Sequence, residues 1–150
     1  MNTYQEETFD GVIDEIKPLL EKHWEEIAMN KDNIKLSPDY AKYEQLYNAD
    51  ILRIFTVRSD TDELLGYFIV MVRPHIHYQE HNFAINDILY ISKKCRGGKV
   101  AMKLLRHAEQ ALKKSNVSVI MINMKVHAPF DKLLLACRYK ETERVYTKYI

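Results

Sequence analysis

The 150-residue sequence lacks the features that mark several large classes of protein. Its only two cysteines, Cys95 and Cys137, can form at most one bridge and make no Cys-x-x-Cys metal pair, so we expect reduced thiols. No apolar run is long enough to span a bilayer, and the first residues are polar and acidic, unlike a signal peptide. A net charge of +1 requires no polyanionic partner. We therefore expect a cytoplasmic protein that binds neither membrane nor nucleic acid.

What is present is the composition of an ordinary globular protein. Hydrophobic residues make up 47% and charged residues 29% of the chain, a balance typical of folded rather than disordered or fibrous proteins. The length is enough to bury a core around a central sheet, and no repeat, linker or low-complexity segment divides it. We expect a single domain over residues 1–150.

Hydrophobic periodicity predicts that the first third of the chain is mostly helical. From Phe9 to Ile27 apolar residues recur every three or four positions, which indicates an amphipathic helix. Pro18 lies inside this pattern and removes a backbone donor, so we expect either a kink there or two abutting helices. A second helix is expected from Tyr40 to Tyr47, after a cap at Ser37-Pro38-Asp39 with proline at the first helical position.

The rest of the chain alternates between strand-like and helical segments. Two β-prone runs, Ile51 to Arg58 and Leu64 to Arg73, predict a hairpin, and Pro74 to His81 predicts a loop beyond it. The elements expected after this loop are a strand from Phe83 to Ile91, a helix from about Val100, a strand from Val117 to Val126, a short helix from Pro129 to Ala136 and a closing strand from Thr142 to Tyr149. This order indicates an α/β (α+β) fold, a mixed sheet with helices on both faces.

The segment from Asp87 to Leu105 carries the strongest functional signal. A strand leads into Gly97-Gly98 and a helix follows directly, so unpaired backbone N–H groups and the positive end of the helix dipole point to one place. Such a place binds phosphate groups. Glycine lets the backbone approach an anion, and Arg96 and Lys99 add positive charge. A glycine pair alone is more often a turn, and only its position between strand and helix favours an anion site.

This segment resembles the signature of the GNAT superfamily of acyl-CoA N-acyltransferases, a strand followed by Arg/Gln-x-x-Gly-x-Gly/Ala at the start of a helix. Lys99 stands where the family usually has glycine. The positions that match are Arg96, Val100, Ala101, Leu104 and Leu105. The order of elements is similar along most of the chain, which implies a GNAT-like, mostly antiparallel twisted sheet. Stretches such as His23-Trp24-Glu25-Glu26 also resemble small GNAT proteins encoded by tailed bacteriophages, which would place the protein in a host cytoplasm.

The resemblance implies acetyl-CoA as co-substrate and an amine, on a small molecule or a protein, as acceptor. The backbone of Leu89, Tyr90 and Ile91 would pair with the pantetheine arm, where this strand splays from the one after Val117. Main-chain N–H groups would hold the pyrophosphate at Arg96, Gly97, Gly98, Lys99, Val100 and Ala101. Whether the protein forms a homodimer is left open.

Direct acetyl transfer needs a base that takes a proton from the acceptor ammonium, and an acid for the departing thiolate. Asp87 is the first candidate for the base, because strand alternation places it on the face of Leu89 and Ile91. A solvated aspartate at a strand end, or a cap, is an equal alternative. The tyrosine that serves as the acid in many family members is replaced here by Leu134. Its substitutes are expected among Tyr90, His127, Tyr139 and Tyr146.

Three other hypotheses compete with this one. A metal site at His75, His77 and His81 is disfavoured, because no cysteine or acidic ligand completes it, and this loop would more simply line the acceptor pocket or be exposed. Lys99 and the missing acid also fit a catalytically inactive GNAT-fold protein that binds a host or virion partner. The basic residues around the glycine turn would suit a nucleic-acid accessory protein, but no aromatic residues are interleaved with them.

Overall fold

A five-stranded sheet with the strand order β1-β2-β3-β4-β5 forms the centre of the structure, a computed structural model that describes residues 1–150. The strands are β1 (Thr3–Glu6), β2 (Leu52–Arg58), β3 (Leu64–His75), β4 (Tyr78–Ile91) and β5 (Val117–Met121). The strands β1 to β4 pair with one another in antiparallel fashion, and β5 runs parallel to β4. The expected mixed, mostly antiparallel sheet is therefore confirmed.

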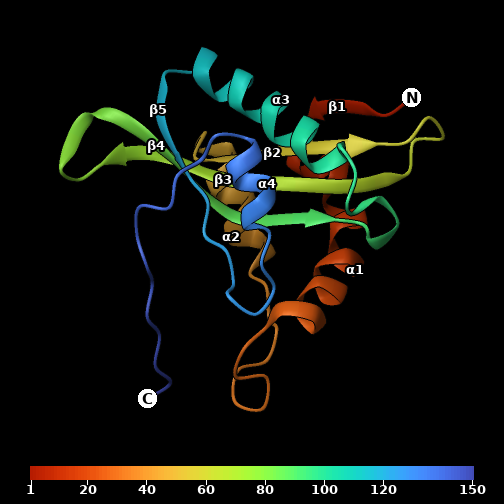
Figure 1. Cartoon of the computed structure of the whole chain (residues 1–150), viewed down its shortest axis with the longest axis horizontal. Coiled ribbons are helices and arrows are strands. Elements are labelled where there is room, and N and C mark those ends of the chain that lie inside the picture. The colour runs from red at the N-terminus through yellow and green to blue at the C-terminus, as the bar shows by residue number, and fades with distance from the viewer.

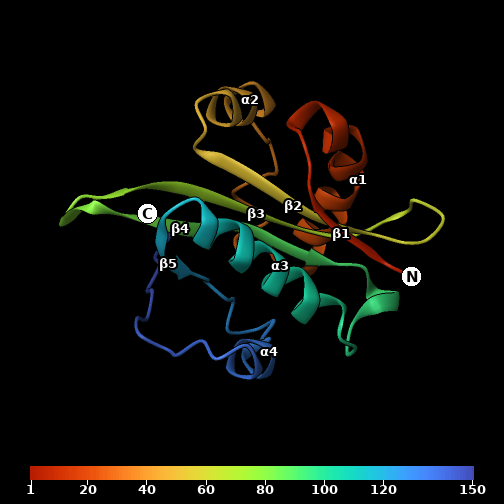
Figure 2. The ribbon, with the colours of Figure 1, turned by 90° about the horizontal axis from the view of Figure 1, so that it is seen from above.

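Helices cover both faces of this sheet (Figure 1). The view from above in Figure 2 separates the layers. The helices α1 (Phe9–Ile27) and α2 (Tyr40–Asn48) lie on one face, and α3 (Val100–Lys114) and α4 (Asp131–Ala136) lie on the other. A short 3₁₀ helix, η1 (Lys93–Cys95), precedes α3. No helix is both long enough and apolar enough to cross a membrane.

Each face has its own hydrophobic cluster. On the α1 side, Phe9, Val12, Ile16 and Leu20 pack as an apolar stripe against buried side chains of β2, β3 and β4, including Tyr67 and Tyr90. On the α3 side, the buried stripe consists of Leu104, Leu105, Ala108 and Leu112. The middle strands β2 and β3 are covered on both faces, and for this reason β3 reads as a nearly continuous apolar run from Leu64 to Val72.

The two amino-terminal helices begin at side-chain caps, which satisfy backbone donors that a helix terminus leaves unpaired. The hydroxyl of Thr8 accepts from the Gly11 amide, and α1 then runs through Pro18 as one helix, so the alternative of two abutting helices is wrong. Proline removes only one hydrogen bond, and apolar residues on both sides of it are anchored to the sheet. For α2 the cap is Asp39, so Pro38 precedes the helix instead of opening it.

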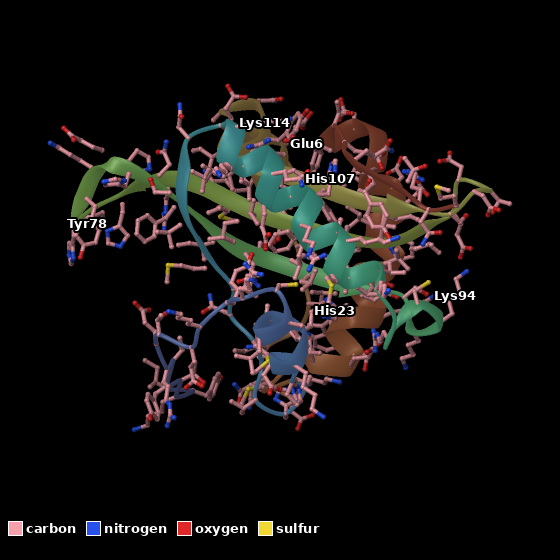
Figure 3. The ribbon with its side chains drawn as sticks, turned by 45° about the horizontal axis from the view of Figure 1, so that its top comes forward. Glu6, His23, Tyr78, Lys94, His107 and Lys114 are labelled. Atoms are coloured by element: carbon pink, nitrogen blue, oxygen red, sulfur yellow. The ribbon has the colours of Figure 1, made fainter.

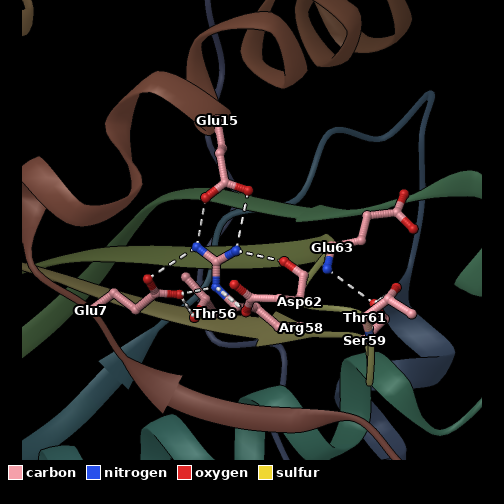
Figure 4. A network of polar contacts seen from close by, with 8 residues as sticks. All are labelled: Glu7, Glu15, Thr56, Arg58, Ser59, Thr61, Asp62 and Glu63. Carbon is pink, nitrogen blue, oxygen red and sulfur yellow. Dashed lines mark hydrogen bonds and ion pairs between the residues drawn. The ribbon is translucent and has the colours of Figure 1, made fainter.

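A buried ion-pair network fixes β1 and α1 to the middle of the sheet (Figure 4). Arg58 is only 6% exposed, and its guanidinium donates to both carboxylate oxygens of Glu7 and of Glu15 and to the Asp62 carbonyl. Thr56 donates to Glu7 as well. Burial alone would raise the pKa of Glu7, but the hydrogen bonds from Arg58 and Thr56 outweigh it and lower that pKa.

Two expectations about the strands are wrong, and one strand was not expected. The segment from Pro74 to His81 is mostly strand, because β3 and β4 extend into a hairpin that projects from the body of the molecule (Figure 1). The sequence reasoning overlooked β1, a four-residue edge strand of mixed polarity. The segment from Thr142 to Tyr149 is not a strand: it pairs with nothing, and Tyr146 is 87% exposed. Strand propensity alone does not form a strand where no neighbour supplies the ladder hydrogen bonds.

Candidate functional site

The turn between β4 and α3 presents a row of free backbone donors. The amides of residues 97 to 102 donate to no acceptor in the chain, and the first intrahelical bond runs from the Lys103 amide to the Lys99 carbonyl. Gly97 has a φ of +81°, a left-handed conformation that favours glycine, and a Cβ there would meet nothing within 4 Å. The space beside the Gly97 Cα is therefore open, and the free amides lie at the positive end of a 15-residue helix.

Arg96 takes a different place from the one expected at this turn. Its amide donates to the Lys93 carbonyl at 3.3 Å and is not free. Its guanidinium folds back, with Nε 2.8 Å from the Ile91 carbonyl oxygen and Nη1 2.8 Å from the Glu26 carboxylate on α1. The side chain of Arg96 therefore ties the turn to α1, and the hydrogen bonds from Arg96 lower the pKa of Glu26.

The other basic side chains around the turn differ in whether they have an acidic partner. Lys93 is paired with Glu26. Lys94 is paired with Glu63. Lys99 and Lys103 form no ion pair, so their charges add to the positive potential in front of the free amides. Figure 3 shows Lys94 at this end of the molecule and Tyr78 at the opposite end, on the tip of the β3–β4 hairpin.

The parallel strands β4 and β5 separate before they reach the turn. Their pairing covers Asn82 to Ile85 of β4, whereas β4 itself continues to Ile91. At the point of separation, the Asn86 side chain accepts from the Asn123 amide at 2.6 Å and donates to its carbonyl at 3.3 Å. Beyond this amide clip, the edge of β4 that faces away from β3 has no strand partner. An extended ligand could pair with such an edge, which includes Leu89, Tyr90 and Ile91.

A β-bulge reorients Asp87. In the β3–β4 register Ile69 pairs with Ile88 and Val70 with Asn86, so Asp87 has no partner in β3. The expected alternation is therefore wrong here: Leu89 and Ile91 pack on the α3 side, whereas Asp87 accepts a hydrogen bond from the hydroxyl of Tyr43 on α2. Bulges often redirect a side chain next to an active site. Burial raises the pKa of Asp87, and the hydrogen bond from Tyr43 opposes this only in part.

An aromatic cluster continues from Asp87 toward the turn. Tyr90 stacks on Tyr67 with 5.4 Å between ring centroids, and the ring of His23 lies 5.5 Å from Tyr90. The Arg96 guanidinium lies 6.0 Å from the Tyr90 ring. Burial lowers the pKa of His23, and the Glu26 charge opposes that shift. The sequence candidates Asp87 and Tyr90 thus share the α1 side of the sheet, near the end of β4.

The remaining candidates lie elsewhere or are already bonded. His127 is exposed, and its Nε2 lies 3.0 Å from the Ile27 carbonyl at the end of α1. The Tyr139 hydroxyl is buried without a hydrogen bond, and burial together with the Glu109 charge raises its pKa. Tyr146 is on the exposed tail. His81 bonds to Ser118, while His75 and His77 contact each other at the hairpin tip, so the three histidines do not converge.

Sequence reasoning missed two residues of this site. Nothing in the sequence distinguishes Tyr43 from the nine other tyrosines, and its helix carries no other functional signal. Glu26 is likewise one of several acidic residues on α1. Both act through partners distant in sequence: Tyr43 is 44 residues from Asp87, and Glu26 is 70 residues from Arg96. No local pattern in one sequence identifies such pairs.

Comparison with known proteins settles the family. Residues 14–133, well over half of the chain, match the model of the acetyltransferase (GNAT) family. The chain belongs to the GNAT family. By family it is an acetyltransferase, an enzyme whose acceptor is unknown. No curated protein sequence matches the chain significantly.

Solved acetyltransferase structures share the GNAT fold of this chain. An aminoglycoside acetyltransferase from an uncultured soil metagenomic sample, in complex with sisomicin, is 14% identical with a TM-score of 0.77, covering 99% of this chain and 95% of that one. The ribosomal-protein-alanine N-acetyltransferase of Brucella melitensis biovar Abortus 2308 is 18% identical with a TM-score of 0.71 over 100% of both chains. A predicted acetyltransferase of Clostridium acetobutylicum with acetyl-CoA is 10% identical, with a TM-score of 0.74, over 99% and 96% of the two chains. At these identities the likeness shows the fold alone.

Proposed function

We propose that the whole chain forms one domain that uses acetyl-CoA to acetylate an amine on a small molecule or a protein directly. The observation that carries this proposal is the row of free amides at residues 97 to 102, beside an edge of β4 that has no partner. A diphosphate would be held by the amides of Gly97, Gly98, Lys99, Val100 and Ala101, with positive charge from Lys99 and Lys103. The cytoplasmic location and the resemblance to phage-encoded proteins stay predictions.

Direct acetyl transfer requires two proton transfers and the correct placement of the two substrates. The acceptor ammonium loses a proton, its nitrogen bonds to the acetyl carbon, the carbon–sulfur bond breaks, and the CoA thiolate takes up a proton. Holding the two substrates together supplies a large share of the rate. Asp87 is our candidate base: its raised pKa brings it closer to the operating pH, and it lies at the bulge where β4 leaves β5. For the acid, Tyr90 stays the candidate best placed on the open part of β4, whereas His127 is engaged by the end of α1.

The first test is thermal stabilisation by acetyl-CoA. At 100 times its dissociation constant, a ligand that binds only the folded chain stabilises it by about 2.7 kcal/mol, which raises the melting temperature by roughly 5–10 °C for a protein of this size. Acetyl-pantetheine, which lacks the diphosphate, is the matched control and should give a much smaller shift at the same concentration. An unchanged melting temperature with saturating acetyl-CoA would contradict the proposal.

The second test is turnover. Release of free thiol from acetyl-CoA is measured with a panel of amines that includes polyamines, aminoglycosides and peptides with a free N-terminus. We expect one class to be acetylated, and Asp87→Asn to lower the rate by about 100-fold or more. Stabilisation by acetyl-CoA without turnover of any amine would favour the alternative, a catalytically inactive GNAT-fold protein that binds a host or virion partner.

A further inference from the structure

The contact between Tyr43 and Asp87 joins α2 to the bulged position of β4. α2 contributes no fully buried residue, and Tyr43 is one of the partly buried side chains by which it packs on the α1-side cluster. The hydroxyl extends past this apolar contact to Oδ2 of Asp87, at the bulged position of β4. The other carboxylate oxygen, Oδ1, has no partner in the chain. One oxygen is therefore fixed, and the other is available.

Tyr43 is a permanent donor in this contact. Burial of the phenol and the neighbouring Asp87 carboxylate raise the pKa of Tyr43 well above its ordinary value, so the hydroxyl keeps its proton throughout the physiological pH range. A neutral donor to a carboxylate orients it and favours its charged form. The same contact therefore sets both the direction of the carboxylate and its readiness to accept a proton.

The surroundings leave Tyr43 as the one group that performs this task. Four tyrosines face this region from the packed elements: Tyr40 and Tyr43 of α2, Tyr67 of β3 and Tyr90 of β4. From α1, Lys17 lies 5.0 Å from the Tyr40 ring with Glu21 nearby, and the His23 ring lies 5.5 Å from that of Tyr90, but no Lys, Arg or His pairs with Asp87. Tyr67 is fully buried, and its hydroxyl has no hydrogen-bond partner within the protein. An unpaired buried hydroxyl is unfavourable, and a polar ligand bound here would offset that cost.

We propose that Tyr43 is a positioning residue, whose hydroxyl holds Oδ2 of Asp87 so that Oδ1 faces the acceptor and takes the proton from its ammonium group. This inference rests on the proposed acetyltransferase function. The proton moves to Oδ1, the freed nitrogen lone pair bonds to the acetyl carbon, and the carbon–sulfur bond breaks with its electron pair on the CoA sulfur, which takes up a proton. Tyr43 keeps its own proton throughout.

The test replaces Tyr43 by phenylalanine, which keeps the ring in the α1-side cluster and removes only the hydroxyl. Tyr40→Phe is the matched control, since Tyr40 lies on the same helix with its ring centroid 6.5 Å from that of Tyr43 and forms no hydrogen bond to Asp87. The pKa of Asp87 is followed by carboxyl ¹³C NMR, and kcat/KM is measured across pH with the amine that the unaltered protein acetylates.

In Tyr43→Phe we expect the Asp87 titration and the acid limb of the kcat/KM profile to move together to higher pH, because the bond that favours the charged carboxylate is lost. The value of kcat/KM at neutral pH should fall about tenfold or more, while stabilisation by acetyl-CoA stays unchanged. Tyr40→Phe should shift neither curve. An unshifted acid limb in Tyr43→Phe, in a chain that still binds acetyl-CoA and turns over, overturns the inference and leaves the proposed function intact. Absence of any turnover by the unaltered protein overturns both.

Discussion

Replacing Arg58 by methionine should destabilise the protein strongly, although this residue is not part of the candidate site. The change keeps an apolar stem of similar length and removes a guanidinium that donates five hydrogen bonds. Glu7 would be left as a charged group with a side chain only 13% exposed. Breaking a buried pair in this way costs 3–5 kcal/mol in typical cases. We expect about 3 kcal/mol, the lower end, because the side chain of Glu15 is 46% exposed and can recover solvation.

The loss can be measured by urea unfolding and should lower the melting temperature by roughly 6–12 °C. Removing Glu7 as well, in the double variant Arg58→Met with Glu7→Met, should recover much of the stability, because no charge then stays buried alone. Arg144→Met is the control: its pair with Glu141 is more than 70% exposed on both sides, and its effect should stay within about 0.5 kcal/mol.

The penalty of Arg58→Met also has a predicted pH dependence. The network lowers the pKa of Glu7 below its ordinary value of 4.5, so the pair contributes its full stability above that value and loses it as the pH falls through the lowered pKa. The difference between the variant and the unaltered protein should therefore shrink in acid. A loss below about 1 kcal/mol at neutral pH, or a double variant no more stable than the single one, would refute the reasoning.

Two further predictions concern β3 and β4, the strands that lead to the candidate site. In Gly66→Ala the new Cβ would lie 2.7 Å from the Tyr90 carbonyl oxygen, so the free energy of unfolding, measured in urea, should fall by about 1–3 kcal/mol. Stabilisation of this variant by acetyl-CoA should also be weaker. Gly98→Ala is the control and should unfold like the unaltered protein, because its Cβ would have no neighbour closer than 3.9 Å. In Asn86→Ala the side-chain clip to Asn123 is lost, so hydrogen exchange of the Asn123 amide should accelerate and the free energy of unfolding should fall by about 1–2 kcal/mol. An Asn123 amide that is as protected as before would show that the clip does not hold β4 and β5 together where they separate.

The sequence by itself determined the elements that depend on local pattern. The apolar period from Phe9 to Ile27 specified α1, and the order of strand, Gly97-Gly98 and helix specified a turn with free amides, because helix termini leave donors unpaired wherever they occur. The segment from Thr142 to Tyr149 shows the limit of such reasoning: its strand propensity is real, but a strand needs a partner that local sequence does not name.

Tertiary structure alone decided how the candidate site is arranged. The bulge at Asp87 reversed its expected face, since alternation holds only while each residue has one partner on the next strand. Arg96 was drawn away from the anion site by Glu26, and Tyr43 was brought to Asp87 by the packing of α2. These contacts join residues 44 and 70 positions apart, and their geometry follows from how the helices and the sheet pack, which periodicity and propensity do not encode.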